Sequence, residues 1–87
     1  DAWRKLGWSH FQAGQYAEAA SALRKANHID PTHAETYSFL GEALVLASKR
    51  EGRMPRSARA AFEKALKLNP KDARARYFHA LALDLNG

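Results

Sequence analysis

Residues 3–10 read WRKLGWSH, and residues 37–44, which lie 34 positions later, read YSFLGEAL. Both stretches carry an aromatic residue, a leucine and a glycine at the same spacing. A second pair follows, because residues 19–31 read AASALRKANHIDP and residues 58–70 read ARAAFEKALKLNP. Self-similarity at a fixed period is typical of repeat proteins. The sequence therefore contains two copies of one structural unit.

Each copy has the pattern of a helical hairpin. Apolar residues recur at the i, i+3, i+4 spacing of amphipathic helices, and no segment alternates with the period of a strand. Gly14 is placed to end a helix, and the prolines that close both copies stop the second helix of each. We therefore predict an all-α array of antiparallel helical hairpins. The expected helices cover residues 2–13, 16–28, 33–50, 55–68 and 72–85.

The second copy is longer than the first. Pro31 and Pro70 lie 39 positions apart, which is five more than the spacing of the two aromatic-leucine-glycine stretches. The added residues fall in SKREGRMPR, about residues 48–56. We expect this insertion to lengthen the preceding helix or to form a mobile loop. Because loop length costs little free energy, we expect a four-residue turn to replace it without loss of folding.

These positions resemble the tetratricopeptide repeat, which follows W-x2-L-G-x2-Y…A-x3-F…P on a 34-residue period. The resemblance implies one domain with a first repeat over about 1–33, a second over about 34–72 and a solitary helix over about 73–87. It rests on Trp3, Leu6, Gly7, His10, Ala19, Leu23 and Pro31, and on Tyr37, Leu40, Gly41, Leu44, Ala58, Phe62 and Pro70.

The same pattern predicts the core. The residues that we expect to be buried are Trp3, Leu6, Leu23, Tyr37, Leu40, Leu44, Phe62 and Leu66. The solitary helix fits less well, since Arg76 and His79 stand where the pattern has apolar residues. Its partner helix is missing from the sequence. The sequence also begins at Asp1 without an initiator methionine, and we expect it to be part of a longer protein.

The composition argues against several functions. The 87 residues contain no cysteine, which excludes disulfides, thiolate metal sites and a cysteine nucleophile. The four histidines lack the spacing of a helical zinc site, and no glycine-rich phosphate loop is present, so we expect no enzyme, no metal and no cofactor. The net charge of +5 is spread along the chain without a groove-reading motif, so we expect no nucleic-acid binding. No apolar run approaches the ~20 residues of a membrane helix.

A second aromatic stripe runs along the first helix, where Trp8 and Phe11 flank the core stripe. In tetratricopeptide arrays the first helix of each hairpin lines the concave surface. The resemblance therefore implies that the Trp8 and Phe11 rings face a groove, and that Glu35 of the third helix faces the same groove. The predicted peptide-binding groove consists of Arg4, Trp8, Phe11, Gln12, Ser38, Glu42, Val45, Arg74, Tyr77 and Leu81. The alternative is that Trp8 and Phe11 pack under a preceding helix. We favour the groove because large exposed apolar patches mark interaction sites.

Three kinds of binding module remain to be compared. Some tetratricopeptide domains clamp a terminal carboxylate with Lys, Asn, Asn, Lys and Arg at fixed positions. Those positions here hold Arg4, Trp8, Phe39, Arg74 and Phe78. Aromatic rings replace both amides and one cation, which argues against a two-carboxylate clamp. The second kind of module has a groove that accepts an amphipathic helix. The third kind is a structural module that stacks on other repeats or forms a homodimer through its last helix.

The second half carries a narrower resemblance. Residues 41–87 are similar to the C-terminal repeats of bacterial c-type cytochrome maturation factors of the CcmI/CycH type. The match rests on Glu42-Ala43-Leu44, Gly52-Arg53, Ala58, Phe62, Ala65-Leu66, Asn69-Pro70, Arg74-Ala75-Arg76 and Gly87, whereas His79 departs from it. The resemblance implies a periplasmic chaperone, tethered to the inner membrane by other segments, that holds the C-terminal helix of apocytochrome c. The alternative is a scaffold or oligomerisation module without a cytochrome role.

Overall fold

The computed structural model describes residues 2–48 and 54–86, with side chains as far as residue 81. Within these ranges the chain forms five α-helices and no strand. They are α1 (Ala2–Gln12), α2 (Tyr16–Ile29), α3 (Ala34–Ala47), α4 (Arg56–Leu68) and α5 (Ala73–Asn86). The predicted all-α fold is confirmed.

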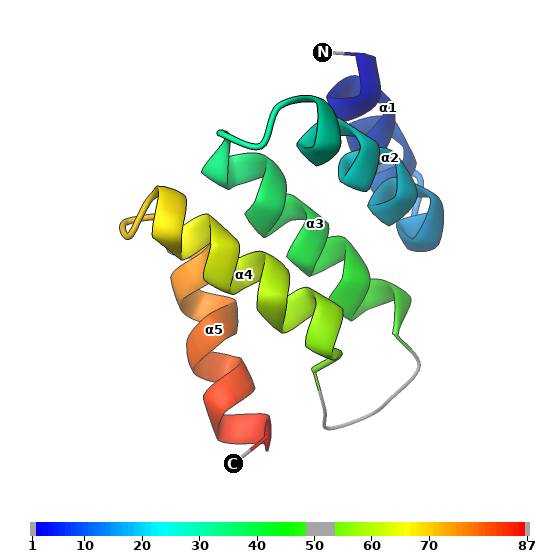
Figure 1. Cartoon of the computed structure of the whole chain (residues 1–87). Coiled ribbons are helices and arrows are strands. Elements are labelled where there is room, and N and C mark those ends of the chain that lie inside the picture. The colour runs from blue at the N-terminus through cyan, green and yellow to red at the C-terminus, as the bar shows by residue number, and fades with distance from the viewer. Residues whose placement is uncertain (1, 49–53, 87) are drawn as a thin grey trace.

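The helices stack in the order in which they occur in the chain (Figure 1). α1 and α2 form one antiparallel hairpin, α3 and α4 form the next, and α5 packs against α4 with a smaller contact to α3. The described part of the molecule measures 37 × 27 × 17 Å along its principal axes. Contacts that connect mainly neighbouring elements are the architecture of a repeat array.

The ends of the helices follow the local sequence signals. Gly14 has a φ of +78°, the left-handed conformation in which glycine ends helices, and the N–H of Gln15 donates to the carbonyl of His10 at 2.9 Å. At the start of α5, the Asp72 carboxylate accepts a hydrogen bond of 2.9 Å from the N–H of Ala75. This carboxylate acts as an N-cap.

The insertion does not lengthen α3. We expected a helix as far as residue 50, but α3 ends at Ala47, and the N–H of Ser48 closes the last turn on the carbonyl of Leu44. Most of the insertion, residues 49–53, lies outside the described residues, so the expectation of a mobile loop is not tested there. Met54, however, is only 6% exposed and packs against Phe62 and its neighbours. The expectation that the whole insertion is dispensable is therefore corrected, because Met54 belongs to the core.

Two clusters of buried side chains hold the array together, and both are rich in alanine. The first comprises Ala19, Ala20, Leu23, Leu40, Ala43 and Ala61, and the second comprises Met54, Ala58, Phe62, Ala65 and Ala75. Small side chains let the helix axes approach, so the larger side chains fill the remaining space. The predicted burial of Leu23, Leu40 and Phe62 is confirmed.

The prediction for Leu6 is wrong, because its side chain is 42% exposed. α1 is the first helix of the described array and packs chiefly against α2, so its buried stripe is narrow. Gly7, which faces Leu23, is the buried residue of α1. Four other residues of the predicted core are only partly buried, namely Trp3, Tyr37, Leu44 and Leu66.

Candidate functional site

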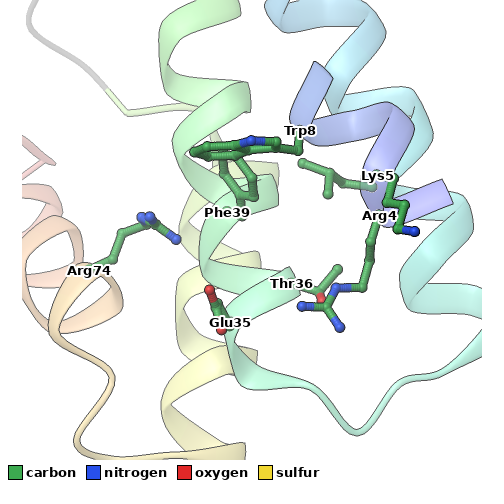
Figure 2. A pocket seen from close by; sticks show the side chains of 8 residues that line it. Arg4, Lys5, Trp8, Glu35, Thr36, Phe39 and Arg74 are labelled. Atoms are coloured by element: carbon green, nitrogen blue, oxygen red, sulfur yellow. The ribbon is translucent and has the colours of Figure 1, made fainter. Parts of the chain in front are cut away.

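A pocket of about 500 Å³ opens between α1, α3 and the start of α5 (Figure 2). Its lining residues are Arg4, Lys5, Trp8, Leu23, Glu35, Thr36, Phe39 and Arg74. The volume falls within the ~300–1,000 Å³ that is usual for ligand pockets. Three of the residues that we predicted for the groove, Arg4, Trp8 and Arg74, are thus brought together, as is Glu35.

The aromatic stripe of α1 faces α3. The Trp8 ring lies 5.0 Å from the Phe39 ring, centroid to centroid, at an interplanar angle of 58°. Phe11 lies 4.6 Å from Phe39 and 5.2 Å from Tyr16, and it is partly buried against the first core cluster. Trp8 remains 47% exposed. Phe11 therefore serves mainly to pack α1 and α2 against α3, whereas Trp8 presents a ring face to the pocket.

Positive side chains surround this aromatic wall. Arg4 and Lys5 come from α1, and Arg74 reaches in from α5 (Figure 2). The Nε of Arg74 lies 2.8 Å from Oε1 of Glu42, and its guanidinium lies 5.0 Å from the centroid of the Phe39 ring. The ion pair and the cation–π contact together hold Arg74 against α3.

Two polar side chains are buried in this part of the array, and one of them lines the pocket. Thr36, which lines the pocket, is 3% exposed, and Asn27 of α2 is 6% exposed. Among the described residues, neither the Thr36 hydroxyl nor the Asn27 amide has a hydrogen-bond partner. A shift of 39 positions places the same pair on Leu66 and Ala75, which contribute to the second core cluster. The polar positions Asn27 of α2 and Thr36 of α3 thus correspond to the apolar positions Leu66 of α4 and Ala75 of α5.

Ser38, which we predicted to line the groove, is buried between helices instead. Its side chain is fully buried, and its hydroxyl shares its one proton between the carbonyl oxygen of Glu35 at 3.0 Å and Oδ2 of Asp72 at 3.3 Å. Because the capping turn of α5 packs on this face of α3, Ser38 joins two helices and cannot contact a ligand. Glu42 is partly buried and reaches the pocket only through Arg74.

The remaining predicted groove residues lie away from the pocket lining. Gln12 is exposed at the end of α1, and Val45 packs against the second core cluster. Tyr77 is 65% exposed and meets Phe78 edge to face at 5.1 Å, while Leu81 is partly buried. Their role in a longer groove stays a prediction.

Four lining residues are absent from the predicted groove, namely Lys5, Leu23, Thr36 and Phe39. For Phe39 a signal existed, because it occupies a position that binds ligand in the carboxylate-clamping relatives. Leu23 was correctly assigned to the core, and one edge of it also reaches the pocket. Lys5 and Thr36 carried no signal, since they are brought together only by the way α1 and α3 lie against each other.

Neither a metal-binding cluster nor a membrane-spanning helix is found among the described residues. No group of three His, Asp or Glu side chains there could hold a metal ion. None of the helices in that part of the chain is long and apolar enough to span a membrane.

Two sequence profiles of the tetratricopeptide repeat match, one over residues 1–33 and the other over residues 42–87. A search among curated proteins finds no match. Tetratricopeptide repeats are protein-interaction modules and are generally non-catalytic. With the second profile covering more than half of the residues, and the described part forming five helices stacked as two hairpins and a further helix, this chain belongs to the tetratricopeptide-repeat family.

Proposed function

We propose that this chain is a non-catalytic module that binds a segment of another protein over α1, α3 and α5. The observation that carries the proposal is the pocket, in which the half-exposed Trp8 ring stands against Phe39. Aromatic rings in partly enclosed pockets provide large apolar contact area with few rotatable bonds, and tryptophan is enriched among the residues that dominate binding energy. The pocket therefore anchors the segment.

The segment that suits this surface is an amphipathic helix. Such helices dock by apolar side chains at i, i+3, i+4 and i+7, which need a row of contact points along a groove. The pocket provides the first contact point. We propose that Val45, Tyr77 and Leu81, which lie further along α3 and α5, provide the following ones.

We propose further that the segment is the C-terminal helix of apocytochrome c, held in the periplasm before haem attachment by a protein tethered to the inner membrane. This finer proposal is supported by the resemblance of residues 41–87 to c-type cytochrome maturation factors of the CcmI/CycH type. A scaffold or dimerisation module without a cytochrome ligand is the alternative. It predicts self-association or stacking on other repeats instead of peptide binding.

A fluorescence titration tests the proposal. The sequence contains two tryptophans, so a Trp3→Phe variant leaves Trp8 as the sole reporter. Lys25 Nζ lies 4.4 Å from the centroid of the Trp3 ring, and phenylalanine keeps an aromatic face for it. We expect the C-terminal helical peptide of apocytochrome c to shift the Trp8 emission saturably, whereas a scrambled peptide of equal composition does not. Equal responses to both peptides, or no response to either, would contradict the proposal.

Removing the Trp8 ring should weaken binding strongly. We expect Trp8→Ala to raise the Kd of the apocytochrome c peptide at least about tenfold, or ~1.4 kcal/mol, because the ring forms the wall of the pocket. Isothermal titration calorimetry measures this without needing the fluorophore. Since Trp8 is half exposed, the variant should stay folded, which circular dichroism checks. An unchanged Kd in the folded variant would place the binding surface elsewhere.

A further inference from the structure

The charges around the pocket are unbalanced. Of the lining side chains that the structure describes, Arg4, Lys5 and Arg74 are cationic and Glu35 alone is acidic. Figure 2 shows Arg74 on one side of the Trp8 and Phe39 rings and the two cations of α1 on the other. Charge complementarity therefore favours a ligand that brings a carboxylate beside its apolar contact.

Arg74 is the cation best placed to bind that carboxylate. Its side chain is 34% exposed, and the contact of 2.8 Å to Glu42 engages Nε. A guanidinium has five N–H donors, so the η nitrogens can serve a second carboxylate. Arg74 lines the pocket, whereas Glu42 does not. Glu42 thus pairs with Arg74 without lining the pocket itself. Its negative charge repels a ligand carboxylate that approaches Arg74.

The Trp8 and Phe39 rings determine which kind of ligand group can bind next to the carboxylate. Trp8 and Phe39 present apolar ring faces to a ligand. Apart from the indole N–H of Trp8, these two side chains have no group that could hydrogen-bond the backbone or the terminus of a ligand. We infer, on the basis of the proposed function, that the pocket selects a helical segment with an acidic side chain one turn from a bulky apolar one. The apolar side chain lies against Trp8 and Phe39, and Arg74 binds the carboxylate.

Designed peptides test this selectivity. The probes are alanine-based helical peptides with acetylated and amidated ends, in which leucine and glutamate stand at i and i+4 on one face. A second peptide has glutamine in place of glutamate, and a third is the glutamine peptide with a free C-terminal carboxylate. Binding is followed by Trp8 fluorescence in the Trp3→Phe background. We expect the glutamate peptide to bind at least about fivefold more tightly than the glutamine peptide, with a gap that narrows in high salt.

Variants at Arg74 show which residue binds the acid. Arg74→Gln should remove the gap between the glutamate and glutamine peptides, and Arg74→Lys should keep part of it. Lys64→Gln is the matched control, because it removes one positive charge from an exposed position on α4. This control should leave the gap unchanged.

Glu42→Gln separates recognition of the acid from a merely structural ion pair. The amide oxygen of glutamine can still accept from Nε of Arg74, while the opposing negative charge is gone. We expect the glutamate peptide to bind about threefold more tightly to this variant, the effect of one like charge removed at ~7 Å in water. Glu18→Gln, an equal charge change at an exposed position on α2, should have no effect. If the Arg74–Glu42 ion pair only maintains the structure of the pocket, Glu42→Gln should instead weaken the binding of both the glutamate and the glutamine peptide.

The outcomes distinguish the two levels of the proposal. Equal binding of the glutamate and glutamine peptides would overturn the selectivity and leave peptide binding standing. Preference for the free-carboxylate peptide would overturn it in favour of terminal capture. If neither the designed peptides nor the apocytochrome c peptide bind the folded protein, the proposed function itself fails.

Discussion

At the scale of the residue, the absence of a side chain at Gly41 sets how closely α3 approaches α4. A Cβ built at this position would lie 2.6 Å from two ring carbons of Phe62, which is fully buried. The Phe62 ring cannot stay in that position beside an alanine, so either the ring or one of the helices has to move. The glycine of the repeat pattern is therefore required by packing across the hairpin.

Gly41→Ala should destabilise the protein by ~1–3 kcal/mol, the usual cost of overpacking a core. This sign is opposite to that of an ordinary glycine in a helix, where alanine stabilises by ~1 kcal/mol. Urea unfolding followed by circular dichroism measures the change. The double variant Gly41→Ala with Phe62→Leu should recover part of the loss, because leucine vacates the space. A more stable single variant would show that Phe62 can move aside at little cost.

Asn27 is a buried polar residue at a position where the second repeat has Leu66. A buried amide without a partner costs ~1–3 kcal/mol, so Asn27→Leu, which copies Leu66 of the second repeat, should raise the free energy of unfolding by at least ~1 kcal/mol. Chemical denaturation measures this. Leu66→Asn is the reciprocal control and should lower it. A loss of stability in Asn27→Leu would indicate that the amide is satisfied by a buried water molecule.

At the scale of the element, a short turn connects α2 to α3 and is ordered by one carboxylate. The hydroxyl of Thr32 donates to Oδ1 of Asp30 at 2.5 Å, and the Thr32 N–H donates to the same oxygen at 3.1 Å. His33 Nε2 lies 2.9 Å from Oδ2. These contacts, with the Thr32 hydroxyl the strongest cause, hold the pKa of Asp30 below its ordinary value of 3.8.

The lowered pKa of Asp30 predicts a pH dependence. Because the folded state favours the ionised carboxylate, its contribution to stability is fully present above pH 3.8 and is lost as the pH falls through the lower folded pKa. Asp30→Asn keeps an acceptor for Thr32 but cannot titrate. We expect the urea midpoint of this variant to fall less than that of the parent protein between pH 7 and the acid range. Parallel curves would show that the turn does not depend on the charge.

At the scale of the whole molecule, two separate core clusters pack different sets of helices together. The first lies among α2, α3 and α4, and the second connects α4 to α5 through Phe62, Ala75 and the stacked Phe78 ring, 5.0 Å from Phe62. Met54 enters the second cluster from the segment that precedes α4. The position of α5, and with it that of Arg74 at the pocket, therefore depends on this cluster.

Met54→Ala should lower the free energy of unfolding by ~2–5 kcal/mol, the usual loss for truncating a buried methionine. Differential scanning calorimetry or urea unfolding measures it. Leu46→Ala is the matched control, since Leu46 is 46% exposed and its truncation should cost far less. Equal losses in both variants would mean that Met54 is not a core residue.

The sequence by itself determined the fold. The recurring leucines, glycines and prolines predicted five helices whose described ends lie within three residues of those expected, and they identified Leu23, Leu40 and Phe62 as core. These features depend on interactions that are local or that recur in every repeat. A helical period shows which residues share one face of a helix, and a glycine or proline shows where that helix ends.

Only the tertiary structure decided which face meets which neighbour. Ser38 and Trp8 flank core stripes in the same way, yet α5 covers Ser38 completely, while Trp8 stays half exposed against Phe39. Arg74 reaches both Glu42 and Phe39 because the capping turn at Asp72 sets the start of α5 against α3. Such contacts join residues more than 30 positions apart, and they depend on the distances and angles between helices, which no single helix specifies.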